Sequence, residues 1–79
     1  MEIKTKIGQR IKFLREQASM SQKDLAYTAD LDRSYIASVE SGCRNISIVN
    51  IEKIANALNV PIKELFNASE FDFTSGSSK

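Results

Sequence analysis

Residues that begin and end helices recur at short intervals along this chain, and they restrict it to short helices. Ser21, Asp32 and Ser47 are good N-cap residues, because a short side-chain oxygen can accept a hydrogen bond from a free backbone amide. Gly42 and Asn59 suit the left-handed conformation in which many helices end. This punctuation predicts five helices with brief connections, and no segment reads as a strand with a partner. We therefore predict a compact, five-helix all-α fold.

Apolar residues recur at helical spacing within these segments, at 4–18, 21–29, 33–41, 48–58 and 61–66. The segment 48–58 has the clearest amphipathic period. One apolar face per helix is typical of helices that cover a common core. The expected core residues of the first four helices are Ile3, Ile7, Ile11, Leu14, Leu25, Ala26, Ala29, Ile36, Val39, Ile48, Ile51, Ile54, Ala55 and Leu58.

Bulk properties narrow the class of protein. A chain of 79 residues is one domain, with room for a helical core but not for a deep catalytic cleft. The lone Cys43 cannot form an internal disulfide, and the apolar stretches are too short to span a bilayer. We therefore expect a cytoplasmic protein without membrane contact. The formal net charge of +1 is a weak argument for a nucleic-acid partner, so any basic face depends on local charge distribution.

The combinations of residues typical of catalytic sites are missing. The sequence has no histidine, its one cysteine has no base or metal partner nearby in sequence, and its three glycines are scattered. Acidic residues are spread singly over helix faces, as on a solvated surface. We predict that the chain is not an enzyme and has no metal or other cofactor.

The segments 21–29 and 33–41 are two short helices joined by a tight turn, which is the helix-turn-helix plan. In that plan the second helix enters the major groove of DNA. Its outward positions carry small side chains, which would let the backbone approach DNA closely, and Arg33 offers a fork of donors suited to guanine. The predicted base contacts are Arg33, Ser34, Ser38 and Ala37.

Residues 8–66 resemble the helix-turn-helix class of lambda-type phage repressors and Cro proteins, the XRE-type family. The similarity lies in Ser-Gln-Lys-Asp-Leu-Ala at 21–26, Asp-Arg-Ser-Tyr-Ile at 32–36 and Val-Glu-Ser-Gly at 39–42. Within that class, Glu-Ser-Gly-Cys-Arg-Asn-Ile-Ser at 40–47 is most similar to the controller proteins of restriction–modification systems. The resemblance implies a lambda-repressor-like DNA-binding domain.

The resemblance also implies roles for individual residues. A buried ion pair between Arg15 and Glu40 would lock the first helix to the end of the third. Many members of the class have an amide where Arg33 stands, so the class does not supply a base preference here, and Cys43 receives no role. Contacts to the DNA backbone or groove edge are expected from Gln22, Tyr35, Arg44, Asn45 and Ser21.

Each of these positions also has a purely structural interpretation. Ser21 and Asp32 can act only as helix caps. Tyr35 can be a half-buried core aromatic. The remaining side chains can be ordinary surface or loop residues: Gln22, Arg33, Ser34, Ser38, Arg44 and Asn45.

The end of the chain bears on assembly. Residues 1–66 form the predicted domain, in which 61–66 is a short dimerisation helix with an apolar edge of Ile62, Leu65 and Phe66. A domain this small has little interior left for them, which favours a homodimer over burial within the monomer. Residues 67–79, with Phe71 and Phe73, read as a partly flexible tail of undetermined role.

The predicted function is sequence-specific regulation of transcription by a homodimer on a near-palindromic double-stranded DNA operator. The resemblance to controller proteins implies regulation of its own gene and a restriction endonuclease gene, with two dimers on adjacent sites and RNA polymerase as further partners. A phage-type repressor or an antitoxin of the same fold is an alternative. A protein-interaction module that has lost DNA binding is another, and the net charge of +1 is its best support.

Overall fold

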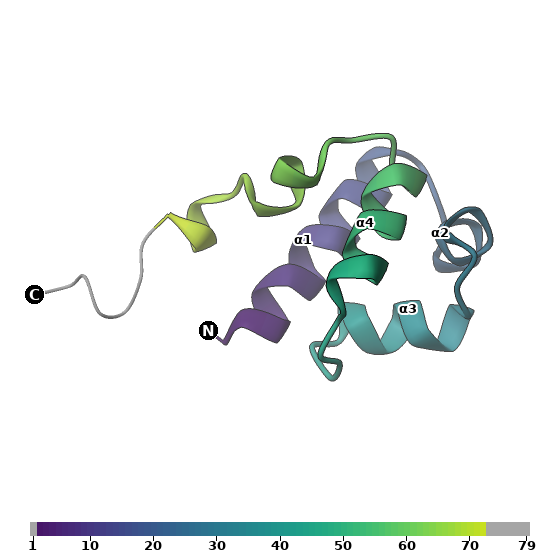
Figure 1. Cartoon of the computed structure of the whole chain (residues 1–79), viewed down its shortest axis with the longest axis horizontal. Helices are drawn as coiled ribbons and strands as arrows, with labels where there is room; N and C mark the ends of the chain where they lie inside the picture. Colours follow the sequence, from purple (N-terminus) through teal and green to yellow (C-terminus); the bar gives the residue numbers. More distant parts are fainter. Residues whose placement is uncertain (1, 73–79) are drawn as a thin grey trace, which may run out of the picture.

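The computed structural model describes residues 2–72, and all of the regular secondary structure within them is helical, as predicted. Phe73 and the rest of the predicted tail lie outside the described residues. Helix α3 packs against both α1 and α2, α4 packs against α2, and η1 packs against α1 and α4 (Figure 1). The elements are α1 Ile3–Gln17, α2 Gln22–Ala29, α3 Arg33–Glu40, α4 Ile48–Ala57, and the 3₁₀ helices η1 Ile62–Phe66 and η2 Ser69–Phe71.

The predicted caps of α2 and α4 are present. The Ser47 hydroxyl accepts a hydrogen bond from the Asn50 amide at 3.1 Å. Ser21 and Asp24 form a reciprocal capping box, with both hydrogen bonds at 3.0 Å. Bonds from the Ser21 backbone amide and then its hydroxyl lower the pKa of Asp24, so this cap contributes at neutral pH and is lost as the pH falls through that lowered value. Asp32 is at the N-cap position of α3, but its side chain makes no capping hydrogen bond, contrary to the expectation.

Positive backbone angles end the helices where the sequence predicted them. Gly42 has φ 83° and Asn59 has φ 60°. Asp30 also has a left-handed backbone, with φ 58°, and turns the chain from α2 toward α3. The tight turn between these two helices therefore rests on a residue type that tolerates this region.

The core contains most of the predicted apolar residues, with Leu65 in addition. The assignment of Ile3 and Ile48 to the core was wrong, because these side chains are 59% and 69% exposed. Each is the first residue of its helix and lies beyond the packed part of the apolar face. Within residues 2–72, twelve apolar residues are buried: Ile7, Ile11, Leu25, Ala26, Ala29, Ile36, Val39, Ile51, Ile54, Ala55, Leu58 and Leu65.

The fifth helix differs from the prediction in its packing. Residues 62–66 form the 3₁₀ helix η1, and Leu65 is fully buried between this helix, α1 and α4. The assignment of Leu65 to a dimer interface was therefore wrong, because the monomer already covers it. Arg10 holds η1 to α1, since its Nε donates to the Glu64 carbonyl oxygen at 3.0 Å and its guanidinium pairs with the Glu64 carboxylate at 3.6 Å.

A further helical turn follows η1. Residues 69–71 form the short 3₁₀ helix η2, which the sequence analysis did not predict. The Phe71 ring packs edge-on against Phe66 with centroids 5.3 Å apart, and it is half-buried against the core. This contact extends the folded part of the chain past residue 66.

A buried ion pair joins three helices at one point. The Arg15 guanidinium donates to both carboxylate oxygens of Glu40, at 2.6 and 3.0 Å. Its remaining nitrogen donates to the Met20 carbonyl oxygen at 2.8 Å. Gln22, the first residue of α2, donates to the same Glu40 carboxylate at 3.1 Å. The pair therefore fixes the end of α3 to α1 and to the start of α2, and the hydrogen bond to Glu40 raises the pKa of Arg15 further.

Gly8 allows α1 to approach α3 beside this pair. A Cβ atom at Gly8 would collide with the Val39 backbone carbonyl oxygen and press on that of Glu40. Neither atom can move without shifting the end of α3. A glycine is required here by the close approach of the two helices.

We predict that Glu40→Gln destabilises the domain by about 3–5 kcal/mol, because it leaves the buried Arg15 charge without its partner. The measurement is the free energy of unfolding in urea. Glu52→Gln is the matched control, since Glu52 is exposed on α4 and makes no ion pair among residues 2–72; it should change stability by less than about 0.5 kcal/mol. A similar small loss for Glu40→Gln would contradict the structural role of the pair.

Candidate nucleic-acid interface

The start of α3 exposes the residues predicted to read DNA bases. Arg33 and Ser34 are exposed, and Arg33 makes no ion pair among residues 2–72. Ala37 and Ser38 lie one turn further along and are half-buried. Small side chains lie beside the Arg33 guanidinium, and this arrangement is suited to close approach by a ligand with acceptor groups.

The loop after α3 brings Arg44 back onto that helix. Its Nε donates to the Ser38 hydroxyl at 3.0 Å, and its guanidinium lies 5.0 Å from the centre of the Tyr35 ring. The Ser38 hydroxyl in turn donates to the Tyr35 carbonyl oxygen at 2.8 Å. Two sets of residues that were predicted separately, from the helix and from the loop, therefore meet in one cluster.

Tyr35 has the structural role considered for it, and its contact with DNA stays a prediction. Its ring is half-buried and packs against the core, and it also carries Arg44 on one face. Its hydroxyl accepts a hydrogen bond from the Asn50 side-chain amide at 3.0 Å. The sequence analysis missed Asn50, which belongs to α4 and has no motif that marks it.

The other residues predicted to contact the DNA backbone lie at the start of α2, beside the end of α3, and in the loop after α3. Gln22 uses one amide N–H for Glu40, so its second N–H is available for a phosphate. The Ser21 hydroxyl accepts from the Asp24 amide as part of the α2 cap. Asn45 is exposed beside Arg44. Glu40, to which Gln22 is bonded, lies about 10 Å from Arg33 along the rise of α3.

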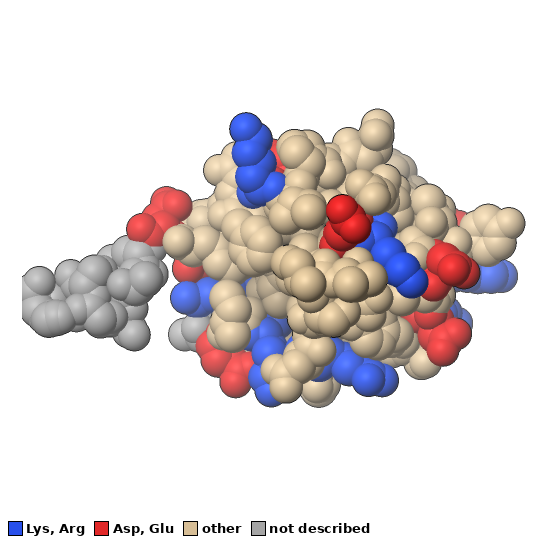
Figure 2. Space-filling view, viewed as in Figure 1, with Lys and Arg blue, Asp and Glu red and all other residues tan. Residues whose placement is uncertain are grey.

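Charges of both signs are mixed over the surface. Figure 2 shows Lys and Arg side chains along the lower edge, where α3 and the following loop lie in Figure 1, with acidic side chains among them. This distribution agrees with a net charge of only +1. Attraction to a polyanion must therefore come from a few well-placed cations and not from a broad basic face.

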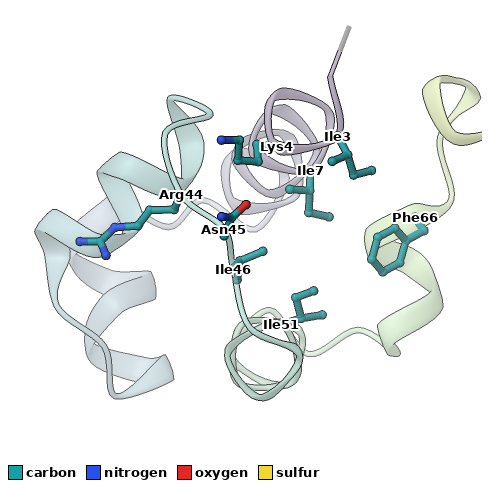
Figure 3. Close-up of a pocket in the computed structure, with 8 residues that line it drawn as sticks. All are labelled: Ile3, Lys4, Ile7, Arg44, Asn45, Ile46, Ile51 and Phe66. Atoms are coloured by element: carbon teal, nitrogen blue, oxygen red, sulfur yellow. The ribbon is translucent and has the colours of Figure 1, made fainter.

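An apolar cavity lies behind the Arg44 loop. Its volume is about 190 Å³. Figure 3 shows Arg44 turned away from this cavity and Phe66 facing it from the opposite side. The residues that line it are Ile3, Lys4, Ile7, Arg44, Asn45, Ile46, Ile51 and Phe66. This lining holds no acid, histidine or cysteine, and residues 2–72 contain no cluster of three side chains suited to a metal ion.

The helices of the described part of the chain are all too short or too polar to cross a membrane.

Comparison with known proteins places this geometry in a family. Residues 8–70 match the family described as a helix-turn-helix domain. The control protein C.MunI of a Mycoplasma species is 44% identical over 70 residues, covering 87% of this chain and 95% of the relative. The control protein C.BamHI of Bacillus amyloliquefaciens is 44% identical over 66 residues, covering 82% of each.

Solved structures agree. The crystal structure of the restriction–modification controller protein C.AhdI from Aeromonas hydrophila superposes with a TM-score of 0.79 at 49% identity, covering 80% of this chain and 96% of that one. The family match spans most of the chain, and the alignments cover nearly the whole length of C.MunI and C.AhdI. The chain therefore belongs to the helix-turn-helix family of DNA-binding transcription regulators, which are not enzymes, and within it to the controller proteins of restriction–modification systems.

Proposed function

We propose that this protein is a cytoplasmic, sequence-specific regulator that binds a near-palindromic operator as a homodimer and controls its own gene and a restriction endonuclease gene. The observation that carries the proposal is the cluster on α3, where the exposed Arg33 and the ordered Arg44 flank a face of small side chains. Two dimers on adjacent sites, and contact of the bound protein with RNA polymerase, would let occupancy set the balance of activation and repression.

Recognition would have two physical parts. Arg33, Ser34, Ala37 and Ser38 would read base edges from the major groove, and a bidentate arginine–guanine pair contributes about 1–3 kcal/mol of discrimination. Backbone and groove-edge contacts would set register and carry the salt-dependent part of the affinity. These contacts would come from Ser21, Gln22, Tyr35, Arg44 and Asn45.

The proposed dimer surface contains Ile62 and Phe66. Their side chains remain 38% and 37% exposed in the monomer, although neighbouring Leu65 is fully buried. Ile3 lies across the cavity from Phe66 and is also exposed. Large apolar side chains on η1 fit self-association through a two-fold axis, which would present two α3 helices to half-sites about one DNA turn apart.

A protein-interaction module without DNA binding is the competing function, and the mixed surface charge favours it. The two are separated by fluorescence anisotropy on DNA from immediately upstream of the protein's own gene, against scrambled DNA, at two salt concentrations. Tight binding that prefers the upstream DNA and weakens with salt supports the operator-binding regulator. Equal, weak binding to both sequences counts against autoregulation and favours a protein partner or an operator elsewhere.

We predict that Arg33→Ala weakens operator binding by about 5- to 150-fold, which corresponds to about 1–3 kcal/mol, and relaxes sequence preference while leaving stability unchanged. Arg33→Lys should fail to restore preference, because an ammonium group cannot form the planar bidentate pair. Anisotropy on operator and scrambled DNA measures both effects. Lys12→Ala, at an exposed position of α1, is the control for losing one positive charge. An unchanged operator preference in Arg33→Ala would refute the assignment of α3 as the recognition helix.

We predict that Phe66→Ala raises the dimer dissociation constant by at least about tenfold, since burying a phenylalanine stabilises an interface by about 1.5–3 kcal/mol. Sedimentation equilibrium gives the monomer fraction. Tyr27→Ala is the matched control, because Tyr27 is an aromatic residue of α2, not of η1, and is 88% exposed. If the two variants show the same monomer fraction as the parent protein, the dimer does not use η1.

A further inference from the structure

Asn50 makes a contact that neither the core nor the predicted DNA interface explains. It lies in the first turn of α4, outside the helix-turn-helix pair, and is half-buried. Its backbone amide is used by the Ser47 cap. Its side-chain amide donates to the Tyr35 hydroxyl at 3.0 Å and so connects α4 to the recognition helix α3.

Tyr35 passes this contact on to Arg44. The aromatic ring supports the guanidinium on one face at 5.0 Å, and the Ser38 hydroxyl holds its Nε at 3.0 Å. Among residues 2–72, the hydrogen bonds of Arg44 end there, so its two terminal nitrogens remain for a ligand. These terminal nitrogens are a pair of donors that can bind guanine O6 and N7 or two phosphate oxygens.

The position of the ring decides where that pair of donors points. Core packing restrains the buried part of the Tyr35 ring, but a ring free at its hydroxyl end could still shift about its side-chain torsions, and an arginine stacked on it would move with it. The hydroxyl is the far end of the ring, so a hydrogen bond there restrains this rocking most effectively. An arginine that is already ordered loses less conformational freedom on binding. It also adopts the binding geometry more often than other geometries.

We propose that Asn50 is a positioning residue for DNA recognition, which acts through Tyr35 to hold Arg44 in its binding geometry and so increases selectivity for the operator. The inference rests on the proposed function, because it requires Arg44 to contact DNA. Asn50 itself need not touch the DNA, and its effect should pass entirely through the aromatic ring and the arginine.

The first test uses the free protein. In a nitrogen–proton NMR spectrum, the Arg44 Nε–H, assigned by its loss in Arg44→Lys, should be shifted by the Tyr35 ring and slow to exchange. Asn50→Ala and Tyr35→Phe should both move this signal toward the position of an exposed arginine. Asn56→Ala, the same change at an exposed position of α4, should leave it in place. A signal that does not move in Asn50→Ala would overturn the restraint.

The second test measures selectivity as the ratio of dissociation constants for scrambled and operator DNA. Asn50→Ala should lower this ratio about three- to tenfold, with little change in binding to scrambled DNA and in thermal stability. Tyr35→Phe should lower it similarly, and the double variant Asn50→Ala/Tyr35→Phe should be no worse than either single variant. In an Arg44→Ala background, Asn50→Ala should have no further effect.

The remaining outcomes separate this inference from the function on which it rests. If Asn50→Ala weakens binding to operator and scrambled DNA equally, and still does so in the Arg44→Ala background, Asn50 contacts the DNA backbone directly and the positioning role is wrong. If the unaltered protein selects its operator and Asn50→Ala selects it equally well, the inference fails alone. If the unaltered protein shows no selectivity for any upstream DNA, the proposed function fails, and the NMR comparison still decides whether Asn50 orders Arg44.

Discussion

The Arg15 guanidinium connects α1 to the end of α3 and to the start of α2. It binds Glu40 at the end of α3 and the Met20 carbonyl just before α2, and Glu40 also binds Gln22. The close approach of α1 at Gly8 brings these groups within reach of one another. Because an unpaired buried charge is costly, this cluster favours the placement of α1, α2 and α3 in which all of these bonds form. The exposed face of α3 inherits its orientation from that placement.

A net charge of +1 is compatible with DNA binding when a few cations lie where they can contact the DNA. The salt dependence of binding follows the number of phosphates neutralised at the contact, whatever charges lie elsewhere on the protein. A weakly charged surface also binds non-specific DNA less well, so a larger share of the affinity comes from base contacts. Ordered arginines such as Arg44 then matter more than they would on a strongly basic surface.

The sequence correctly predicted features that depend on neighbouring residues. Its predictions were wrong or missing where packing between distant segments determines the structure. The caps at Ser21 and Ser47 need only an amide three residues away, and they were correct. Helical periodicity placed Ile48 in the core because a pattern does not show where the packed part of a helix begins. The burial of Leu65 depends on α1 and α4 closing around η1, and the bond from Asn50 to Tyr35 spans two helices, so neither leaves a local signal.

Local capping and contact between distant segments occur together in the first turn of α4. Ser47 caps the backbone amide of Asn50, which fixes where α4 starts and hence where the Asn50 side chain lies. From that position its amide reaches the Tyr35 hydroxyl, and the Tyr35 ring carries Arg44. A hydrogen bond that the sequence predicts as a helix cap is therefore connected, through Asn50 and Tyr35, to an arginine of the proposed DNA interface. In so small a domain, residues that begin and end helices lie close to the proposed DNA interface, so stability and recognition would depend on the same groups.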